Sequence, residues 1–192
     1  MLTKKAASFP ALALLAVFLS QSLLHAETVD AVALFKQAAG EGKTGVARKT
    51  KPVDARPANA GEIIVTVIKN DGVETKSKPA EPNDFVVRNR CPETGNEEYL
   101  VKAEKFPARY ADAGKAAGEG GWKEYVPQGK DMNFYILPAD TKAFEFQAPW
   151  GETMIAKPGD ALVQTPSDEK DTYRVAAASF ACTYDIVSQP SP

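Results

Sequence analysis

Residues 156–163 of the chain read AKPGDALV, and residues 80–87 read AEPNDFVV, so both fit Ala-x-Pro-x-Asp-x-x-Val. Pro158-Gly159 suits a type II turn, because proline presets φ at the first central position and glycine accepts the positive φ of the second. The first copy has Asn83 in place of the glycine, and asparagine is the best substitute in that conformation. The pattern therefore predicts one turn that is made twice, each time before a strand.

A second pattern repeats in the same order. Residues 99–110 read YLVKAEKFPARY and residues 173–184 read YRVAAASFACTY, and both fit Tyr-x-Val-x-Ala-x-x-Phe-x-x-x-Tyr. Upstream, a strand-like run comes before Asp71-Gly72, which is a strong hairpin signal, and another comes before Pro149-Trp150-Gly151. We interpret the two halves as an internal duplication.

The duplication predicts a mainly β fold of two tandem antiparallel modules, at residues 46–110 and 122–187, with residues 188–192 as a tail. Residues 111–121 are rich in glycine and alanine and are expected to link the modules. The sequence leaves open whether each module is barrel-like or an open sheet. A unit of this size is marginal by itself, so we expect the two modules to pack together.

The N-terminal segments have separate interpretations. Residues 1–26 resemble a secretory signal peptide, with Lys4 and Lys5 before an apolar run and Ala26 at the cleavage site. That predicts an exported protein, periplasmic or secreted, with no stable membrane insertion after cleavage. An uncleaved anchor is the weaker alternative, because spanning a bilayer needs about 20 apolar residues. Residues 27–45 are expected to form a short amphipathic helix that ends near Gly40 and a linker, and the composition of residues 40–58 is linker-like.

Charge and histidine content exclude several function classes. The chain has 23 Lys+Arg, 25 Asp+Glu and one histidine, His25, which would leave with the signal peptide. The remaining chain is mildly acidic, so it has no basic footprint for nucleic acid. Without histidine there is no Ser-His-Asp triad, no Cys-His pair and no His-ligated metal. We therefore expect no cofactor, no metal site and no catalytic residue of a recognisable motif, and we lean against an enzyme.

Cys91 and Cys182 are the only two cysteines. In an oxidising compartment an even count suggests a disulfide, and the two residues occupy different positions in the repeat. That favours a structural bond between the copies over a matched bond inside each. A reactive or redox pair is the alternative, but there is no Cys-x-x-Cys.

Three residues are candidate binding residues. Asp84 and Asp160 follow the repeated turn, where an aspartate can accept turn amides, and the alternative is a binding or catalytic carboxylate. Trp150 lies on a hairpin turn, where it can contact a ligand or cover one end of the core. Trp122 is the other tryptophan to inspect. The repeated Phe and Tyr residues are interpreted as core, with an aromatic platform for a glycan or peptide as the alternative.

Around the Pro158-Gly159-Asp160 turn the second copy resembles the PGDYG-domain family, a small uncharacterised domain. The resemblance covers about residues 122–187, including Trp150-Gly151-Glu152, the AKPGDALV strand and Tyr173-Arg174-Val175. Ala161-Leu162 stands where the family name has Tyr-Gly, and Pro82-Asn83-Asp84-Phe85 makes the first copy a more distant match. The resemblance implies a small domain built around this turn and implies no activity.

Three hypotheses about function follow. The first is a non-catalytic binding or envelope-associated module, in which duplication raises avidity. The second is a carboxylate-based hydrolase acting on an extracytoplasmic polymer, with Asp160, Glu152 and Asp84 as candidates. The third is a structural or stress-related accessory protein without a small ligand. The binding and structural roles rank above the enzyme, and partners are unknown apart from a possible envelope component or protein.

Overall fold

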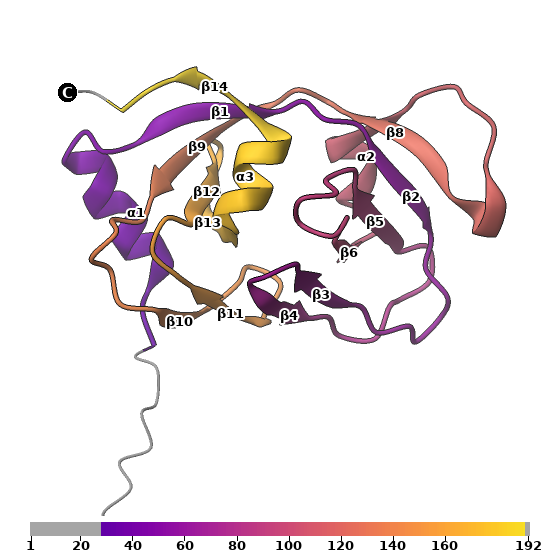
Figure 1. The fold of residues 1–192 in the computed structure, drawn as a ribbon, viewed down its shortest axis with the longest axis horizontal. Helices are drawn as coiled ribbons and strands as arrows, with labels where there is room; N and C mark the ends of the chain where they lie inside the picture. Colours follow the sequence, from indigo (N-terminus) through magenta and orange to yellow (C-terminus); the bar gives the residue numbers. More distant parts are fainter. Residues whose placement is uncertain (1–27, 191–192) are drawn as a thin grey trace, which may run out of the picture.

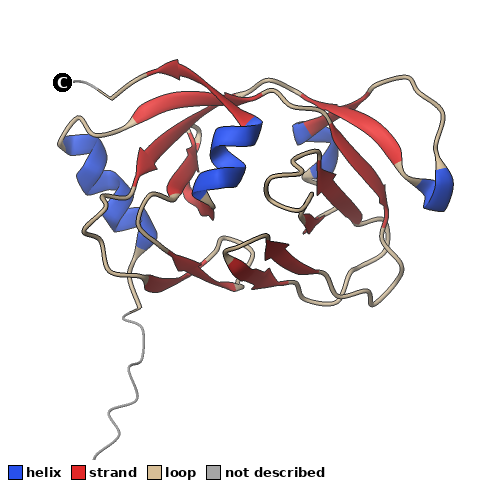
Figure 2. Cartoon of the chain, viewed as in Figure 1, coloured by secondary structure: helices blue, strands red, loops and turns tan. Residues whose placement is uncertain are grey.

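The computed structural model describes residues 28–190, so the signal-peptide prediction lies outside the described residues. Two five-stranded antiparallel sheets and two two-stranded hairpins make up the fold (Figures 1 and 2). The first sheet has the order β6-β5-β2-β8-β7 and the second has the order β13-β12-β9-β1-β14. The predicted mainly β fold of two modules is confirmed, and both sheets are open rather than closed barrels.

The bounds of the elements follow the chain. The first sheet contains β2 (Val53–Pro57), β5 (Phe85–Asn89), β6 (Glu98–Val101), β7 (Tyr110–Asp112) and β8 (Lys123–Pro127). The second contains β1 (Gly45–Lys49), β9 (Asp131–Ile136), β12 (Ala161–Thr165), β13 (Asp168–Val175) and β14 (Tyr184–Ser188). The hairpins are β3 (Val65–Ile68) with β4 (Gly72–Lys76), and β10 (Phe144–Gln147) with β11 (Thr153–Ala156). The helices are α1 (Ala31–Gly40), α2 (Phe106–Arg109) and α3 (Ala177–Thr183), with a 3-10 turn at Glu119–Gly121.

The two halves follow the same backbone path. In each, a sheet strand is followed by a hairpin, two adjacent sheet strands, a short helix and an edge strand. The cross-strand registers also correspond, because Tyr110 pairs with Pro127 in the first sheet as Tyr184 pairs with Lys49 in the second. A brief helix, α2 or α3, comes directly before each final strand. The duplication read from the sequence is thus a duplication of structure.

The two halves exchange one strand each, β1 and β8. In chain order β1 opens the first half, yet it pairs with β9 and β14 of the second sheet. Reciprocally, β8 opens the second half and pairs with β2 and β7 of the first sheet. Only residues 50–52 separate β1 from β2, and only residues 128–130 separate β8 from β9, so each pair of strands continues from one module into the other (Figure 1). Residues 40–58, which resemble a linker in composition, therefore contain two sheet strands.

The two sheets have equivalent cores. Phe106 of α2 and Phe180 of α3 are 5% and 6% exposed and lie at matching repeat positions. Phe106 stacks on Phe85 with ring centroids 3.8 Å apart, and Phe180 stacks on Tyr184 at 4.9 Å. The core interpretation of the repeated phenylalanines is confirmed. The exchanged strands contribute Tyr125 to the first core and Ala47 to the second, so neither core is complete without the other half.

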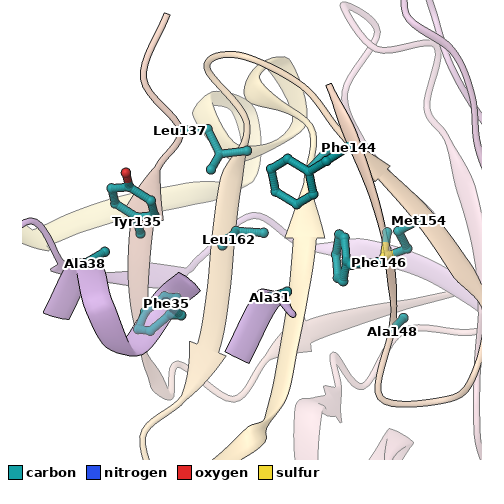
Figure 3. Close-up of a cluster of buried hydrophobic side chains, with 11 residues drawn as sticks. Ala31, Phe35, Ala38, Tyr135, Leu137, Phe144, Phe146, Ala148, Met154 and Leu162 are labelled. Atoms are coloured by element: carbon teal, nitrogen blue, oxygen red, sulfur yellow. The ribbon is translucent and has the colours of Figure 1, made fainter. Parts of the chain in front are cut away.

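A third cluster attaches α1 and the hairpin β10–β11 to the second sheet (Figure 3). The helix begins at Asp30, whose Oδ1 accepts hydrogen bonds from the amides of Val32 and Ala33 at 3.0 Å. Its buried face consists of Ala31, Phe35 and Ala38. The predicted N-terminal helix is therefore confirmed, and it docks on its own protein rather than standing free.

A disulfide joins Cys91, just after β5, to Cys182 of α3, as predicted. The bond links the first module to the second. Within residues 28–190, none of the helices has the length and hydrophobicity needed to cross a bilayer.

Gly45 makes the close approach of β1 to β9 possible. A Cβ on Gly45 would lie 2.5 Å from the Ser188 carbonyl oxygen and 2.6 Å from the Phe134 ring. Gly45→Ala is expected to lower the free energy of unfolding by about 1–3 kcal/mol, because β1 must shift away from its neighbours. Urea denaturation followed by circular dichroism measures the change. Gly40→Ala is the control, since nothing lies within 4 Å of the added Cβ, and an equal loss in both variants would contradict the prediction.

Candidate functional site

A cavity of about 950 Å³ lies between the two modules. Its walls come from both sheets and from both hairpins, which lie beneath the sheets in the view of Figure 1. Eight basic and seven acidic side chains line it, so the charges around it are nearly balanced. The volume is at the upper end of the roughly 300–1,000 Å³ typical of ligand sites.

The four repeated tyrosines all line this cavity. Tyr99 and Tyr110 belong to β6 and β7, which are the opposite edges of the first sheet, yet their hydroxyls are 2.8 Å apart. The sheet therefore curls around the cavity. Burial raises the pKa of Tyr99 and of Tyr184 well above the usual value, and neighbouring phenols add a smaller rise. Burial likewise raises the pKa of Tyr173, so these phenols stay protonated at neutral pH and can donate hydrogen bonds.

Lys49 reaches from β1 of the second sheet to the tyrosine pair of the first. Its Nζ donates to the Tyr99 hydroxyl at 2.9 Å, to Asn89 Oδ1 at 3.0 Å and to the Tyr110 hydroxyl at 3.5 Å. The nearest carboxylate along this network is Glu97, which accepts from Asn89 Nδ2 at 2.8 Å. The lysine charge is thus offset through an amide rather than by a direct ion pair.

Arg109 of α2, in the first half, reaches toward the tyrosine pair of the second half, Tyr173 and Tyr184. Its guanidinium carbon lies 5.6 Å from the centre of the Tyr173 ring, and Nη2 is 3.4 Å from Asp171 Oδ2. Trp150 lies beside the same ring, with a centroid separation of 5.8 Å. One tyrosine is therefore accompanied by a cation and by a second aromatic ring.

The tyrosines occur in both repeats, but the cations beside them do not. The repeat partner of Lys49 is Pro127, and the partner of Arg109 is Thr183, as the strand registers show. The aromatic part of the cavity is therefore duplicated, and each cation is specific to one copy.

Arg174 fastens the two modules together at the cavity wall. Its side chain is 1% exposed and contacts three carboxylates. Nε donates to Asp160 Oδ2 at 2.6 Å, Nη1 to Glu74 Oε1 at 3.0 Å and Nη2 to Asp71 Oδ2 at 2.7 Å. Asp71 and Glu74 belong to the β3–β4 hairpin region of the first half, so this cluster crosses the module boundary.

A second polar cluster crosses the boundary at Glu97. Its carboxylate accepts from Asn89 and Thr94 of its own half and from Ser179 Oγ of α3 at 2.6 Å. The glutamate is 5% exposed. Its three donors explain how a buried carboxylate without a direct cation is tolerated.

Glu74 has the most unusual protonation of the cavity residues. Its side chain is 12% exposed, and burial raises its pKa from 4.5 to about 7. Arg174 opposes this rise, while the charges of Glu97 and Asp160 reinforce it. Near neutral pH this carboxyl is therefore partly protonated.

The raised pKa predicts a pH dependence of stability. The folded state keeps the Glu74 proton between pH 4.5 and about 7 while the unfolded state loses it, so the free energy of unfolding falls as pH rises through that window. The full loss is about 3 kcal/mol. Glu74→Gln should remove it, which urea titrations between pH 4.5 and 8 will measure.

Glu62 offers a matched control for this titration. Its hydrogen bonds with Arg56 lower its pKa to about 2, so the stability it contributes disappears only below pH 4.5. Glu62→Gln should leave the slope between pH 5 and 7 unchanged. Identical slopes for wild type and Glu74→Gln would contradict the assignment.

Asp84 and Asp160 occupy equivalent positions outside the cavity lining. Asp84 accepts from the amides of Glu81 at 2.9 Å and Ala103 at 3.0 Å, and Asp160 accepts from Lys157 at 2.8 Å and Ala177 at 3.0 Å. Each also has a cation on Oδ2, and the two aspartates are only 1% and 3% exposed. Asn83 and Gly159 have the positive φ angles, 68° and 82°, that the turn requires. These buried carboxylates therefore connect the turn to the start of the helical segment that follows, and their oxygens accept hydrogen bonds from the protein itself.

Trp150, the third candidate, does line the cavity and is 36% exposed. Its Nε1 donates to Glu152 Oε2 at 2.9 Å, and Glu152 also accepts from Thr75 Oγ1 and from the Lys78 amide, both at 3.0 Å. Trp150 is therefore held in place by groups of both hairpins. Trp122 is not among the cavity-lining residues and instead packs beneath Arg88, whose guanidinium carbon is 4.1 Å from the ring centre.

The sequence pointed to the tyrosines and to Trp150 but not to Lys49, Arg109 or Glu74. The tyrosines carried a signal because they repeat. Lys49 lies in the segment with linker-like composition, and Arg109 and Glu74 have no repeated counterpart of the same type. Lys49 lies beside Tyr99 at the point where β1 of the second sheet continues into β2 of the first.

Within residues 28–190, no group of three or more Asp, Glu, His or Cys side chains is arranged to hold a metal ion. No family model matches the chain, and no match to a curated protein or to a solved structure is found. The resemblance to the PGDYG-domain family therefore stays a prediction.

Proposed function

We propose that this chain is an exported, non-catalytic binding protein that holds its ligand in the cavity between the two modules. The observation that carries the proposal is the cavity itself, which is large and is walled by equivalent tyrosines from both repeats. A purely structural protein has no need of an aromatic-lined cavity at the meeting point of its halves. The disulfide and the signal-like N-terminus support an oxidising, extracytoplasmic location.

Equilibrium dialysis of the purified protein against extracts of cell-envelope components tests the proposal, with mass spectrometry of what is retained. We expect wild type to enrich at least one component. Trp150→Ala and Tyr173→Ala should lose it, because both rings line the cavity. Trp122→Ala is the matched tryptophan control and should retain it. Enrichment of nothing, or equal enrichment by all variants, would exclude this function.

A carboxylate-based hydrolase is the second candidate, and one observation favours it. Glu74 lines the cavity with a pKa of about 7, which suits a general acid. The carboxylates of Asp84 and Asp160 already accept hydrogen bonds from backbone amides of their turns. The acid would therefore be Glu74 rather than either of them. A screen on cell-wall and storage polysaccharides decides the matter. Activity that Glu74→Gln abolishes would support the hydrolase, and no activity on any polymer would eliminate it.

A further inference from the structure

The cavity presents aromatic rings to its contents. Tyr173 is half-buried and Trp150 is 36% exposed, and both contribute to the wall. Their ring centroids are 5.8 Å apart and their planes are inclined by 53°, so the two rings form adjoining apolar walls. Such a surface packs against a flat apolar face of a ligand, either an aromatic ring or the C–H face of a sugar.

The cavity is also rich in hydroxyl groups. Four phenols line it, and a phenol can donate one hydrogen bond and accept others, so that even the Tyr99 hydroxyl, which already contacts Lys49 and Tyr110, can accept from a ligand. Three of them have raised pKa values and so keep their protons at neutral pH. A ligand with many groups that both donate and accept is the best complement to this lining, and hydroxyl groups have that property.

Three cations of the cavity already have partners within the protein. Arg174 contacts three carboxylates, Arg109 approaches Asp171, and Lys49 is offset by Glu97 through Asn89. A charged ligand bound beside Arg174, Arg109 or Lys49 would have to displace one of these internal partners. An uncharged ligand uses the cavity as it stands, because burying an unpaired charge is costly.

Size and duplication indicate a ligand made of repeated units. The volume of about 950 Å³ is large for one small ring compound. The Tyr99–Tyr110 pair and the Tyr173–Tyr184 pair occupy equivalent places in the two repeats. Two like sets of groups suit two like parts of one ligand.

We propose that the cavity binds an uncharged oligosaccharide, with sugar rings against Tyr173 and Trp150 and hydroxyl groups on the phenols of both tyrosine pairs. The inference rests on the proposed binding function and narrows its ligand. Arg109 acts as a hydrogen-bond donor to sugar oxygens and helps to fix the direction of the chain, because it has no cationic counterpart in the other repeat. Lys49 keeps its contacts with Asn89, Tyr99 and Tyr110.

Trp122→Phe supplies a direct assay, because it leaves Trp150 as the only tryptophan. We would titrate this variant with three neutral hexasaccharides (of glucose in two linkages and of N-acetylglucosamine) and with a hexamer of galacturonic acid. A saturable change in Trp150 fluorescence is expected with at least one neutral hexamer. Calorimetry with the unsubstituted protein checks that the substitution itself has not altered binding.

Variants separate the ring contacts from the hydroxyl contacts. Tyr173→Ala should weaken binding of the neutral hexamer at least tenfold, through loss of the ring surface. Tyr184→Phe should weaken it about two- to tenfold, through loss of one hydrogen bond. Trp122→Ala should bind as wild type does.

The outcomes distinguish this inference from the proposed function. Tighter binding of the galacturonic acid hexamer than of every neutral hexamer would overturn the uncharged ligand. If no saccharide binds but dialysis finds a retained component that depends on Trp150, the oligosaccharide is wrong and the binding function stands. If neither experiment finds a ligand, both proposals fail.

Discussion

Arg174→Leu is expected to lower the free energy of unfolding by about 3–5 kcal/mol, because it leaves carboxylates of Asp71, Glu74 and Asp160 without their shared cation. The guanidinium is 1% exposed, so solvent cannot replace it. Urea denaturation measures the loss. It should be smaller at pH 5 than at pH 8, since burial raises the pKa of Glu74 to about 7 and its protonated carboxyl at pH 5 needs no cation.

Lys102→Met is the matched control for this prediction. Lys102 donates to Asp84 at 3.0 Å, as Arg174 donates to the equivalent aspartate, but its side chain is 30% exposed. We expect a cost of about 1 kcal/mol, because a more exposed pair contributes less. Equal losses of stability in the two variants would show that Arg174 contributes only through its contact with Asp160, and not through Asp71 and Glu74.

Arg174→Leu should also loosen the contact of the hairpin β3–β4 with the second module. Asp71 and Glu74 reach Arg174 from that hairpin, and Lys157 makes the other contact with Asp71, at 2.7 Å. Amide hydrogen exchange of residues 65–76 is expected to accelerate more in Arg174→Leu than in Lys102→Met. Unchanged exchange there would mean that the hairpin is held by packing alone.

The sequence predicted the parts of the fold that depend on neighbouring residues. Pro158-Gly159 and Pro82-Asn83 determine their turns locally, through φ angles that proline and glycine or asparagine favour. The helix at Ala31–Gly40 begins with the Asp30 cap that the sequence displays. These features need no knowledge of distant segments, and the repeat made the turn visible twice.

The strand exchange could not be predicted in the same way. β1 and β8 can in principle pair with a sheet of either half, because the sheets are built alike. The choice depends on the short connections at residues 50–52 and 128–130, and on the match of Gly45 with Phe134 across β1 and β9. A glycine beside a phenylalanine on another strand is a tertiary relation that no local pattern contains.

The site follows from that exchange more than from any motif. The tyrosines were found as repeated residues and interpreted together with the phenylalanines, yet the phenylalanines fill the cores and the tyrosines also face the cavity. The difference is the phenol, which favours a place at the edge of a core, where its hydroxyl can reach a polar partner. Lys49 and Glu97 come close although β1 belongs to the second sheet and Glu97 lies just before β6 of the first, a relation between sheets that no local pattern contains.

Loss of the Cys91–Cys182 bond is expected to cost about 4–5 kcal/mol, because the bond closes a long loop in the unfolded chain. The two residues are 91 positions apart. The double variant Cys91→Ala/Cys182→Ala should show this loss in urea denaturation under oxidising conditions. Wild type under a reducing agent should match the variant.

The exchanged strands also predict the number of unfolding transitions in the variant. If the disulfide alone held the modules together, its loss would let them unfold in two separate transitions. The structure instead gives each sheet a strand from the other half, so that neither core is complete alone. We therefore expect one cooperative transition at a lower urea concentration, followed in parallel by the fluorescence of Trp122, which lies beside the first sheet, and of Trp150, which lies beside Tyr173 of the second. Two transitions in the variant would show that the strand exchange does not couple the halves, whereas an unchanged midpoint would show that the bond contributes little to stability.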